Sequence, residues 1–202
     1  MAAKKAAARR YRKNRRATAY HRSFGRVATP MQYLEHPRYG DAPIISGERW
    51  TEADVLRSYW GYKHLSWAPK IIYPETARRA DCNRQKFCCF ARWLYVDIGR
   101  QCRACRRCFL FFAVEQKYWY ETLGFHTNID CLDCWECRRD RHHKERLADE
   151  YQDLLSRTDK TVGQWNRLSE LGDQLFEIGY IKKPGTLQKT RMPKRLRARL
   201  LG

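Results

Sequence analysis

The chain has 202 residues, of which 43% are hydrophobic and 31% are charged, and its mean hydropathy is −0.79. No segment approaches the ~18 consecutive apolar residues that a membrane-spanning helix needs, which excludes a multi-span membrane protein. The seven Trp, twelve Tyr and eight Phe residues are too many for a chain that buries no core, which excludes complete disorder. The length fits one domain, or one small domain with extensions.

The net charge of +19 is concentrated at the two ends of the chain. Residues 1–27 contain ten Lys and Arg and no acid, and residues 182–202 contain eight and no acid. Residues 28–181 contain 23 basic and 22 acidic residues and are therefore nearly neutral. This distribution predicts a disordered or extended basic arm over 1–27 and a second basic arm over 182–202.

An acid-free basic arm lowers its free energy by contacting a polyanion and releasing its counterions. We therefore expect the arms to bind nucleic-acid phosphates. An Arg-rich N-terminus without acids is also typical of organelle-import segments. A third interpretation is that the basic segment is a solvated tail. The candidate phosphate-binding residues in the arms are Arg9, Arg10, Arg12, Lys13, Arg15, Arg16, Lys194, Arg195, Arg197 and Arg199.

The segment 28–92 is expected to be irregular, with one short helix. Pro and Gly are frequent over 28–50, and Pro69 and Pro74 interrupt the later part. Thr51-Glu52-Ala53-Asp54 has the spacing of a capping box, and the apolar residues that follow recur at helical intervals. A helix is therefore predicted from Thr51 to Tyr62.

The next segment, 93–140, is predicted to form a compact module. Residues 93–98 and 109–112 are rich in aromatic and apolar residues and are predicted strands. A helix is predicted over 113–122, with Gly124 as its stop, and Gln116 is expected to hydrogen-bond the nearby cysteine turn or to cap a turn.

Two further helices are predicted, one from the last cysteine to Ser156 and one over 162–178. The polar break between them is short, which predicts an antiparallel helical pair over 141–181.

Six of the nine cysteines form two clusters with the same spacing. Cys102, Cys105 and Cys108 are separated by two residues each, and Cys131, Cys134 and Cys137 repeat this pattern after 22 intervening residues. A Cys-x-x-Cys turn directs two thiolates into one hemisphere, and two such turns complete a tetrahedron around Zn²⁺. The spacing therefore predicts one structural zinc ion.

Zinc needs four ligands, so two assignments compete. We favour Cys102, Cys105, Cys134 and Cys137, with Cys108 and Cys131 as alternates, because Cys108 opens an apolar run and suits the core. A disulfide framework is disfavoured because nothing in the sequence indicates secretion. An iron–sulfur cluster is less favoured because neither cluster has the fourth Cys followed by Pro.

The sequence around these cysteines resembles a bacterial family described as a probable zinc-ribbon domain, a small treble-clef-like zinc module without an established activity. The resemblance is strongest over 95–140. It rests on Tyr95-Val96-Asp97-Ile98, Cys102-Arg103-Ala104-Cys105, Glu115-Gln116-Lys117-Tyr118-Trp119-Tyr120, Gly124-Phe125 and Cys134-Trp135-Glu136-Cys137-Arg138. The resemblance implies zinc at Cys102, Cys105, Cys134 and Cys137. The predicted fold class is therefore α+β, with a small zinc ribbon or treble-clef-like module, a helical pair and basic arms.

These observations predict a structural-zinc protein that binds nucleic acid. RNA is favoured over DNA, and the protein could bind RNA in association with the ribosome. Arginines that flank the cysteine turns would add a basic patch to the arms. They are Arg103, Arg106, Arg107, Arg138, Arg139 and Arg141.

The alternative is a zinc-stabilised adaptor that docks a protein partner through its C-terminal helices. We expect no enzymatic activity, because no catalytic constellation is recognisable, and no membrane or small-molecule partner. The absence of an apolar secretory segment favours the reducing cytoplasm.

Overall fold

The computed structural model describes residues 17–21, 25–27, 32–60, 71–87, 91–195 and 198. The chain divides into two compact units, Met1–Trp135 and Glu136–Gly202. Among the described residues, no helix combines the length and the apolar character required to cross a bilayer.

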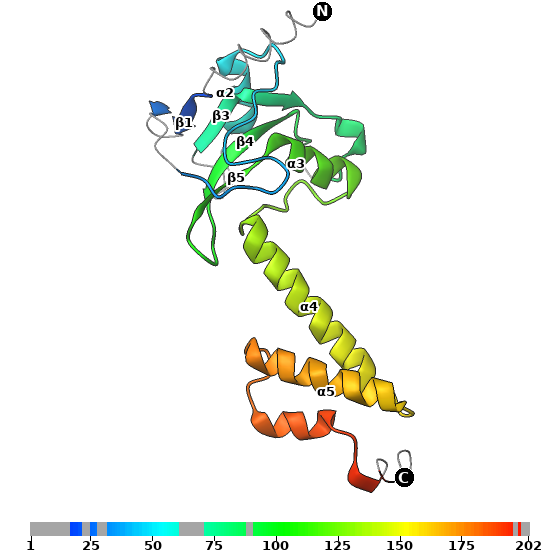
Figure 1. Cartoon of the computed structure of the whole chain (residues 1–202). Helices are drawn as coiled ribbons and strands as arrows, with labels where there is room; N and C mark the ends of the chain where they lie inside the picture. Colours follow the sequence, from blue (N-terminus) through cyan, green and yellow to red (C-terminus); the bar gives the residue numbers. More distant parts are fainter. Residues whose placement is uncertain are drawn as a thin grey trace, which may run out of the picture. The chain divides into compact units, whose positions relative to one another are not determined.

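The first unit is built on a five-stranded antiparallel sheet with the order β2-β1-β3-β4-β5 (Figure 1). The strands are β1 (Ala19–His21), β2 (Gly25–Val27), β3 (Ile71–Arg79), β4 (Leu94–Gln101) and β5 (Cys108–Phe111). The helix α2 (Glu52–Trp60) contacts β3, and α3 (Ala113–Lys117) contacts β3 and β4. A 3-10 turn, η1 (Cys82–Arg84), follows β3, and one π-helical turn, η2 (Tyr118–Thr122), continues α3.

The strand β3 was not expected, because Pro74 lies inside it. The pairing of β3 with β4 shifts at this point: Tyr73 pairs with Asp97, and the next pair is Arg78 with Tyr95. Proline has no N–H to donate to a ladder, and a bulge is one of the few places where a strand accepts it. Within this irregular stretch the Asp97 N–H donates to the Thr76 hydroxyl at 2.7 Å. A local irregularity thus accommodates the proline without ending the strand.

The core of the first unit packs between the sheet, α3 and the segment before α2. Tyr73, Leu110 and Phe112 are buried there together with Tyr33, whose hydroxyl lies 2.7 Å from the Tyr73 hydroxyl. Gln116 is fully buried, and its Nε2 donates to the carbonyls of Val96 on β4 (2.6 Å) and Phe111 on β5 (2.9 Å). Gln116 therefore joins α3 to β4 and β5, a role that the sequence did not indicate.

The second unit contains α4 (Trp135–Ser156), which begins at the end of the first unit, α5 (Val162–Glu177) and the 3-10 segment η3 (Pro184–Thr190). In Figure 1, α5 starts beside the end of α4 and runs back obliquely to it. Tyr151 and Leu154 of α4 form one core with Leu168, Leu171 and Leu175 of α5. A capping box between Thr161 and Gln164 starts α5.

The observed elements differ from the expected segments in four places. The N-terminal arm is shorter than 1–27, because β1 and β2 lie within it and Ala17 is buried. The segment 28–92 contains β3 as well as α2. The boundary at 140 falls inside α4, which is continuous from Trp135. The C-terminal arm contains η3, which packs on α5 through Leu187 and Thr190.

Replacing Gly172 by Ala is expected to destabilise the second unit by about 1–3 kcal/mol, the usual cost of overpacking. A Cβ at this position would lie 2.9 Å from Cγ2 and 3.1 Å from Oγ1 of Thr190, so η3 would have to move. Gly163→Ala in the same helix is the matched control, since a Cβ there meets no atom within 4 Å. It should stabilise the unit by about 0.5–1 kcal/mol. Denaturant unfolding of both variants measures the difference, and equal effects would contradict the packing of η3.

Candidate metal centre

The first cysteine turn closes the hairpin between β4 and β5. Gln101 and Cys108 are the last pair of the ladder, so residues 102–107 form the loop. The Cys102 N–H donates to the Arg107 carbonyl at 2.9 Å, and the Arg106 N–H donates to the Cys102 carbonyl at 3.0 Å. Arg106 has a φ of 64°, which is unusual for a residue with a side chain. This tight loop directs Cys102 and Cys105 to the same side.

The second cysteine turn leads directly into α4. Cys134 is the residue before the helix, and Cys137 lies in its first turn. The Arg103 N–H donates to the Leu132 carbonyl at 2.9 Å, which joins the two turns through their backbones. The Trp135 indole Nε1 donates to the Glu35 carbonyl at 2.7 Å. Both contacts fix the point at which α4 begins.

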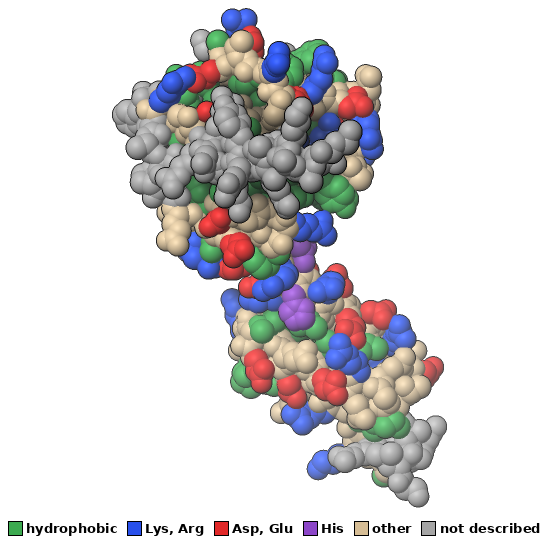
Figure 2. Space-filling model, turned by 45° about the horizontal axis from the view of Figure 1, so that its top comes forward, with side chains coloured by type: hydrophobic (Ala, Val, Ile, Leu, Met, Phe, Trp, Pro, Cys, Tyr) green, Lys and Arg blue, Asp and Glu red, His purple; other side chains and the backbone are tan. Residues whose placement is uncertain are grey.

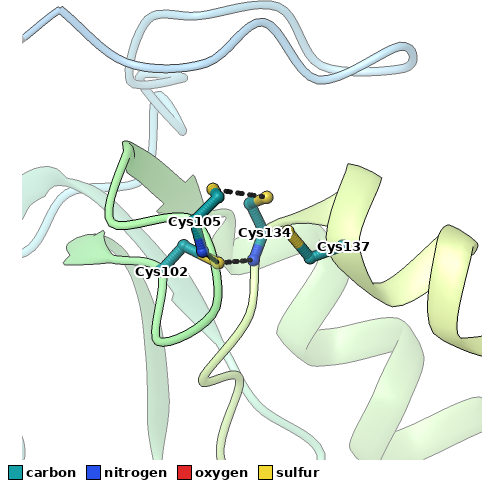
Figure 3. A group of neighbouring side chains, drawn as sticks. All are labelled: Cys102, Cys105, Cys134 and Cys137. Carbon is teal, nitrogen blue, oxygen red and sulfur yellow. Dashed lines mark hydrogen bonds between the residues drawn. The ribbon is translucent and has the colours of Figure 1, made fainter. Parts of the chain in front are cut away.

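The two turns bring four sulfur atoms together (Figure 3). The Sγ atoms of Cys102, Cys105, Cys134 and Cys137 all lie within 4.8 Å of one another, and those of Cys105 and Cys134 are 3.7 Å apart. Backbone N–H groups point at the cluster: Cys134 N lies 3.3 Å and Cys105 N lies 3.5 Å from the Cys102 sulfur. A compact group of four sulfur donors fits a metal ion, and four thiolates are the usual donor set of a closed structural zinc site.

The surroundings of the cluster favour thiolates over thiols. Burial raises the pKa of Cys102, but N–H donors from Cys105, Cys134 and Ala104 outweigh it and lower the pKa. Burial also raises the pKa of Cys105, whereas hydrogen bonds from the side chain and backbone of Arg107 and from the neighbouring thiols lower it to about 6. Thiolates are the form that binds a metal, so the donor set has the chemistry that a cation requires.

The other cysteines of the described residues lie outside the cluster. Cys108 begins β5 and packs, half-buried, against the core around Tyr73. Cys131 is buried, and its thiol donates to the Asp133 carbonyl at 3.4 Å. Cys82 is half-buried and donates to the Arg92 carbonyl at 3.7 Å. Cys88 and Cys89 lie outside the described residues.

The arginines of the expected basic patch are at the surface, and several of them pair with acids. Arg103, Arg106, Arg107, Arg139 and Arg141 are exposed, and Arg138 is half-buried. Arg103 lies 3.9 Å from Asp133, Arg139 lies 3.5 Å from Asp140, and Arg141 lies 3.9 Å from Glu145. In Figure 2, basic and acidic side chains are mixed over the described face. The centre of the chain is therefore balanced in charge at its surface, as its composition indicates.

The arm residues are mostly outside the described part of the chain. Arg9, Arg10, Arg12, Lys13, Arg15, Arg16, Arg197 and Arg199 are not described, whereas Lys194 and Arg195 are exposed. The root of the N-terminal arm is fixed at the sheet, because the Thr18 N–H lies 3.2 Å from both carboxylate oxygens of Glu75.

One buried residue that the sequence analysis did not single out supports the cysteine hairpin. Asp97 on β4 is 1% exposed, and its two carboxylate oxygens accept the N–H groups of Ala113 (2.6 Å) and Ile44 (2.7 Å). It thereby joins β4 to the start of α3 and to the segment before α2. The sequence did contain a sign of this role, because Asp97 lies within the apolar run Leu94-Tyr95-Val96-Asp97-Ile98. Buried acids are rare unless they are paired.

Residues 96–146 match the family model described as "Probable treble clef domain". This match confirms the resemblance for that segment and the α+β zinc-module fold class. The match covers about a quarter of the chain and includes all four clustered cysteines. No curated protein and no solved structure matches the chain.

Proposed function

We propose that the chain binds one structural Zn²⁺ ion through Cys102, Cys105, Cys134 and Cys137, and that it uses this zinc-stabilised module to carry basic arms that bind RNA. The observation that supports the zinc assignment is the group of four sulfurs within 4.8 Å. When bound, the ion would be closed to further ligands, since thiolates fill the tetrahedron. Arg107, which hydrogen-bonds Cys105, and Arg138, next to Cys137, would offset the negative charge of the four thiolates.

The observation that supports nucleic-acid binding is the distribution of charge. The segments 1–27 and 182–202 hold 18 of the 19 net positive charges, and no acid lies in either. On the face drawn in Figure 2, the described side chains between them are mixed in sign. Phosphate contacts by such arms are independent of sequence, so the arms alone favour any nucleic acid. RNA is proposed because a module with exposed aromatic rings suits unstacked bases.

The salt dependence of RNA binding tests this proposal. We expect log K for a single-stranded RNA to fall with log[salt] by about 0.7 for each phosphate contact. Deleting residues 1–16 removes eight Lys and Arg and should make this slope shallower while leaving β1 in place. Replacing the same eight residues by Gln at full length is the matched control and should give the same loss. A slope near zero in the unaltered protein would contradict the proposal.

A second candidate function is a protein-interaction adaptor. The observation that favours it is a set of exposed apolar side chains at the end of α5: Phe176 (37% exposed), Ile178 (37%) and Tyr180 (54%). An interface of this kind would respond weakly to salt, and deletion of 1–16 would leave it intact. The same salt series therefore separates the two functions, and neither of them includes a catalytic step.

A further inference from the structure

A cavity of about 910 Å³ lies on the first unit, away from the cysteine cluster. It is lined by residues of α2 and the segment just before it, the end of β3, η1, the start of β4 and the last residue of α3. It is a depression largely open to solvent, and its volume falls within the ~300–1,000 Å³ range that is typical of small-molecule and cofactor sites. The lining combines aromatic rings, cations and neutral hydrogen-bonding groups.

Two tryptophans line the cavity. Trp93 is 68% exposed, and Trp50 is 37% exposed. The Trp50 indole donates to Glu48 Oε2 at 2.8 Å, which holds this ring, and the Trp93 backbone is held by its carbonyl, which accepts the Ala80 N–H at 3.0 Å. The same Glu48 oxygen accepts the Arg79 N–H at 2.9 Å, which ties Trp50 to the end of β3. Large rings held at the surface around a cavity offer preformed faces for stacking.

Three cations surround these rings. Arg57, Arg79 and Lys117 line the cavity, and neither Arg57 nor Arg79 forms an ion pair within the described part of the chain. Lys117 Nζ lies 3.0 Å from the Arg79 carbonyl and 3.6 Å from Glu121.

The two acids that line the cavity are engaged in capping local structure. Asp54 accepts a hydrogen bond from the Thr51 hydroxyl at the start of α2, and Asp81 accepts the Asn83 N–H at 3.1 Å at the start of η1. The lining therefore holds three cations and two acids, and Arg57 and Arg79 are the cations without an acidic partner in the described part of the chain.

We infer that this cavity binds a nucleotide unit of single-stranded RNA, with the base against Trp93 and Trp50 and the phosphate at Arg57 and Arg79. The inference deepens the proposed function, on which it rests for the identity of the polymer. A cationic ligand is disfavoured because three cations line the site. A purely apolar ligand would leave those cations unpaired. A flat aromatic ring with an attached anion can contact both the tryptophan rings and the cations. Asn83 and Ser58, which also line the cavity, can hydrogen-bond a base edge.

The mononucleotide adenosine 5′-monophosphate tests the cavity directly, without relying on the arms. Saturation-transfer NMR on the full chain should show transfer from protein to the base protons. Trp93→Ala should weaken binding by about 5- to 150-fold, the range expected for loss of one base-stacking platform. Tyr180→Ala, which removes another ring that is more than half exposed, is the matched control and should leave binding unchanged. Trp93 is exposed, so its removal should not unfold the protein.

Arg79→Gln provides an independent readout of the phosphate contact. It should weaken binding of adenosine 5′-monophosphate and leave binding of adenosine unchanged.

Absence of saturation transfer, or equal affinity of Trp93→Ala and the unaltered protein, would overturn the inference. If this happens while RNA binding keeps its steep salt slope, nucleotide binding in the cavity is contradicted and RNA binding by the arms is supported. If the mononucleotide binds as expected but the RNA salt slope is near zero, nucleotide binding in the cavity is supported and RNA binding by the arms is contradicted.

Discussion

Cys134→Ser is expected to abolish stoichiometric zinc binding and to remove the cooperative unfolding transition of the first unit. The free energy of binding structural zinc is about 10–16 kcal/mol in small zinc modules, and it is folding free energy for a core of this size. Cys134 is buried, and its sulfur lies 3.7 Å from that of Cys105. Metal analysis and thermal unfolding measure the two effects. Iron together with visible absorption in the unaltered protein would indicate an iron–sulfur cluster instead.

Cys131→Ser is the matched control for this experiment. Cys131 belongs to the same cysteine run and is equally buried, but its thiol bonds the Asp133 carbonyl and lies outside the four-sulfur cluster. A serine hydroxyl can still donate to that carbonyl, so the variant should keep its zinc and lose about 1 kcal/mol of stability. Loss of zinc in Cys131→Ser with retention in Cys134→Ser would assign the ligands to the alternate set.

Asp97→Ala is expected to destabilise the first unit by about 1–3 kcal/mol for each of the two buried N–H groups that lose their acceptor. The groups belong to Ala113 and Ile44, at 2.6 and 2.7 Å from the carboxylate. Denaturant unfolding measures the loss. Asp41→Ala, at an exposed position, is the control and should change stability by less than about 0.5 kcal/mol. Equal effects of the two substitutions would contradict the bridging role of Asp97.

Asp97 also makes stability depend on pH in a definite direction. Burial raises the pKa of Asp97 to about 7, against the N–H groups of Ala113 and Ile44 and the charge of Arg78, which lower it. In the unfolded chain the pKa of Asp is about 3.9. Between these values the folded state holds a proton that the unfolded state has lost, so stability falls as the pH rises from about 4 to about 7 and is level above that. Asp97→Asn should flatten this slope, and an unchanged slope would refute the assignment.

Local patterns in the sequence predicted several elements well. The capping-box spacing at Thr51 and the helical periodicity after it predicted α2, and the Thr51 hydroxyl accepts the Asp54 N–H at 3.1 Å. The apolar runs predicted β4 and β5, and Gly124, with a φ of 66°, ends the helical segment as expected. The paired Cys-x-x-Cys spacing predicted a group of four sulfurs, and the apolar run after Cys108 together with the family resemblance favoured the four that lie together. Each of these signals is contained within a few residues.

The elements that the sequence did not predict depend on distant partners. β1 has three residues, and it joins the sheet by pairing with β3, about 50 residues later, as well as with the neighbouring β2. β3 contains a proline, and its ladder with β4 shifts register between Tyr73 and Arg78, where the Asp97 N–H donates to the Thr76 hydroxyl. Gln116 is buried because carbonyls from two strands converge on its amide. The cavity at Trp93 joins five elements, and its composition could not be read from any one stretch of chain.

The separation of the two cysteine turns has a consequence for the unfolded chain. Cys105 and Cys134 are 29 positions apart, so an ion that keeps ligands from both turns closes a loop of that length even when the sheet has opened. A cross-link over such a loop removes about 3–4 kcal/mol of chain entropy from the unfolded ensemble in the polymer description of disulfides. If an ion stays bound to both turns, the unfolded chain keeps them close together, and refolding does not have to bring them into contact again.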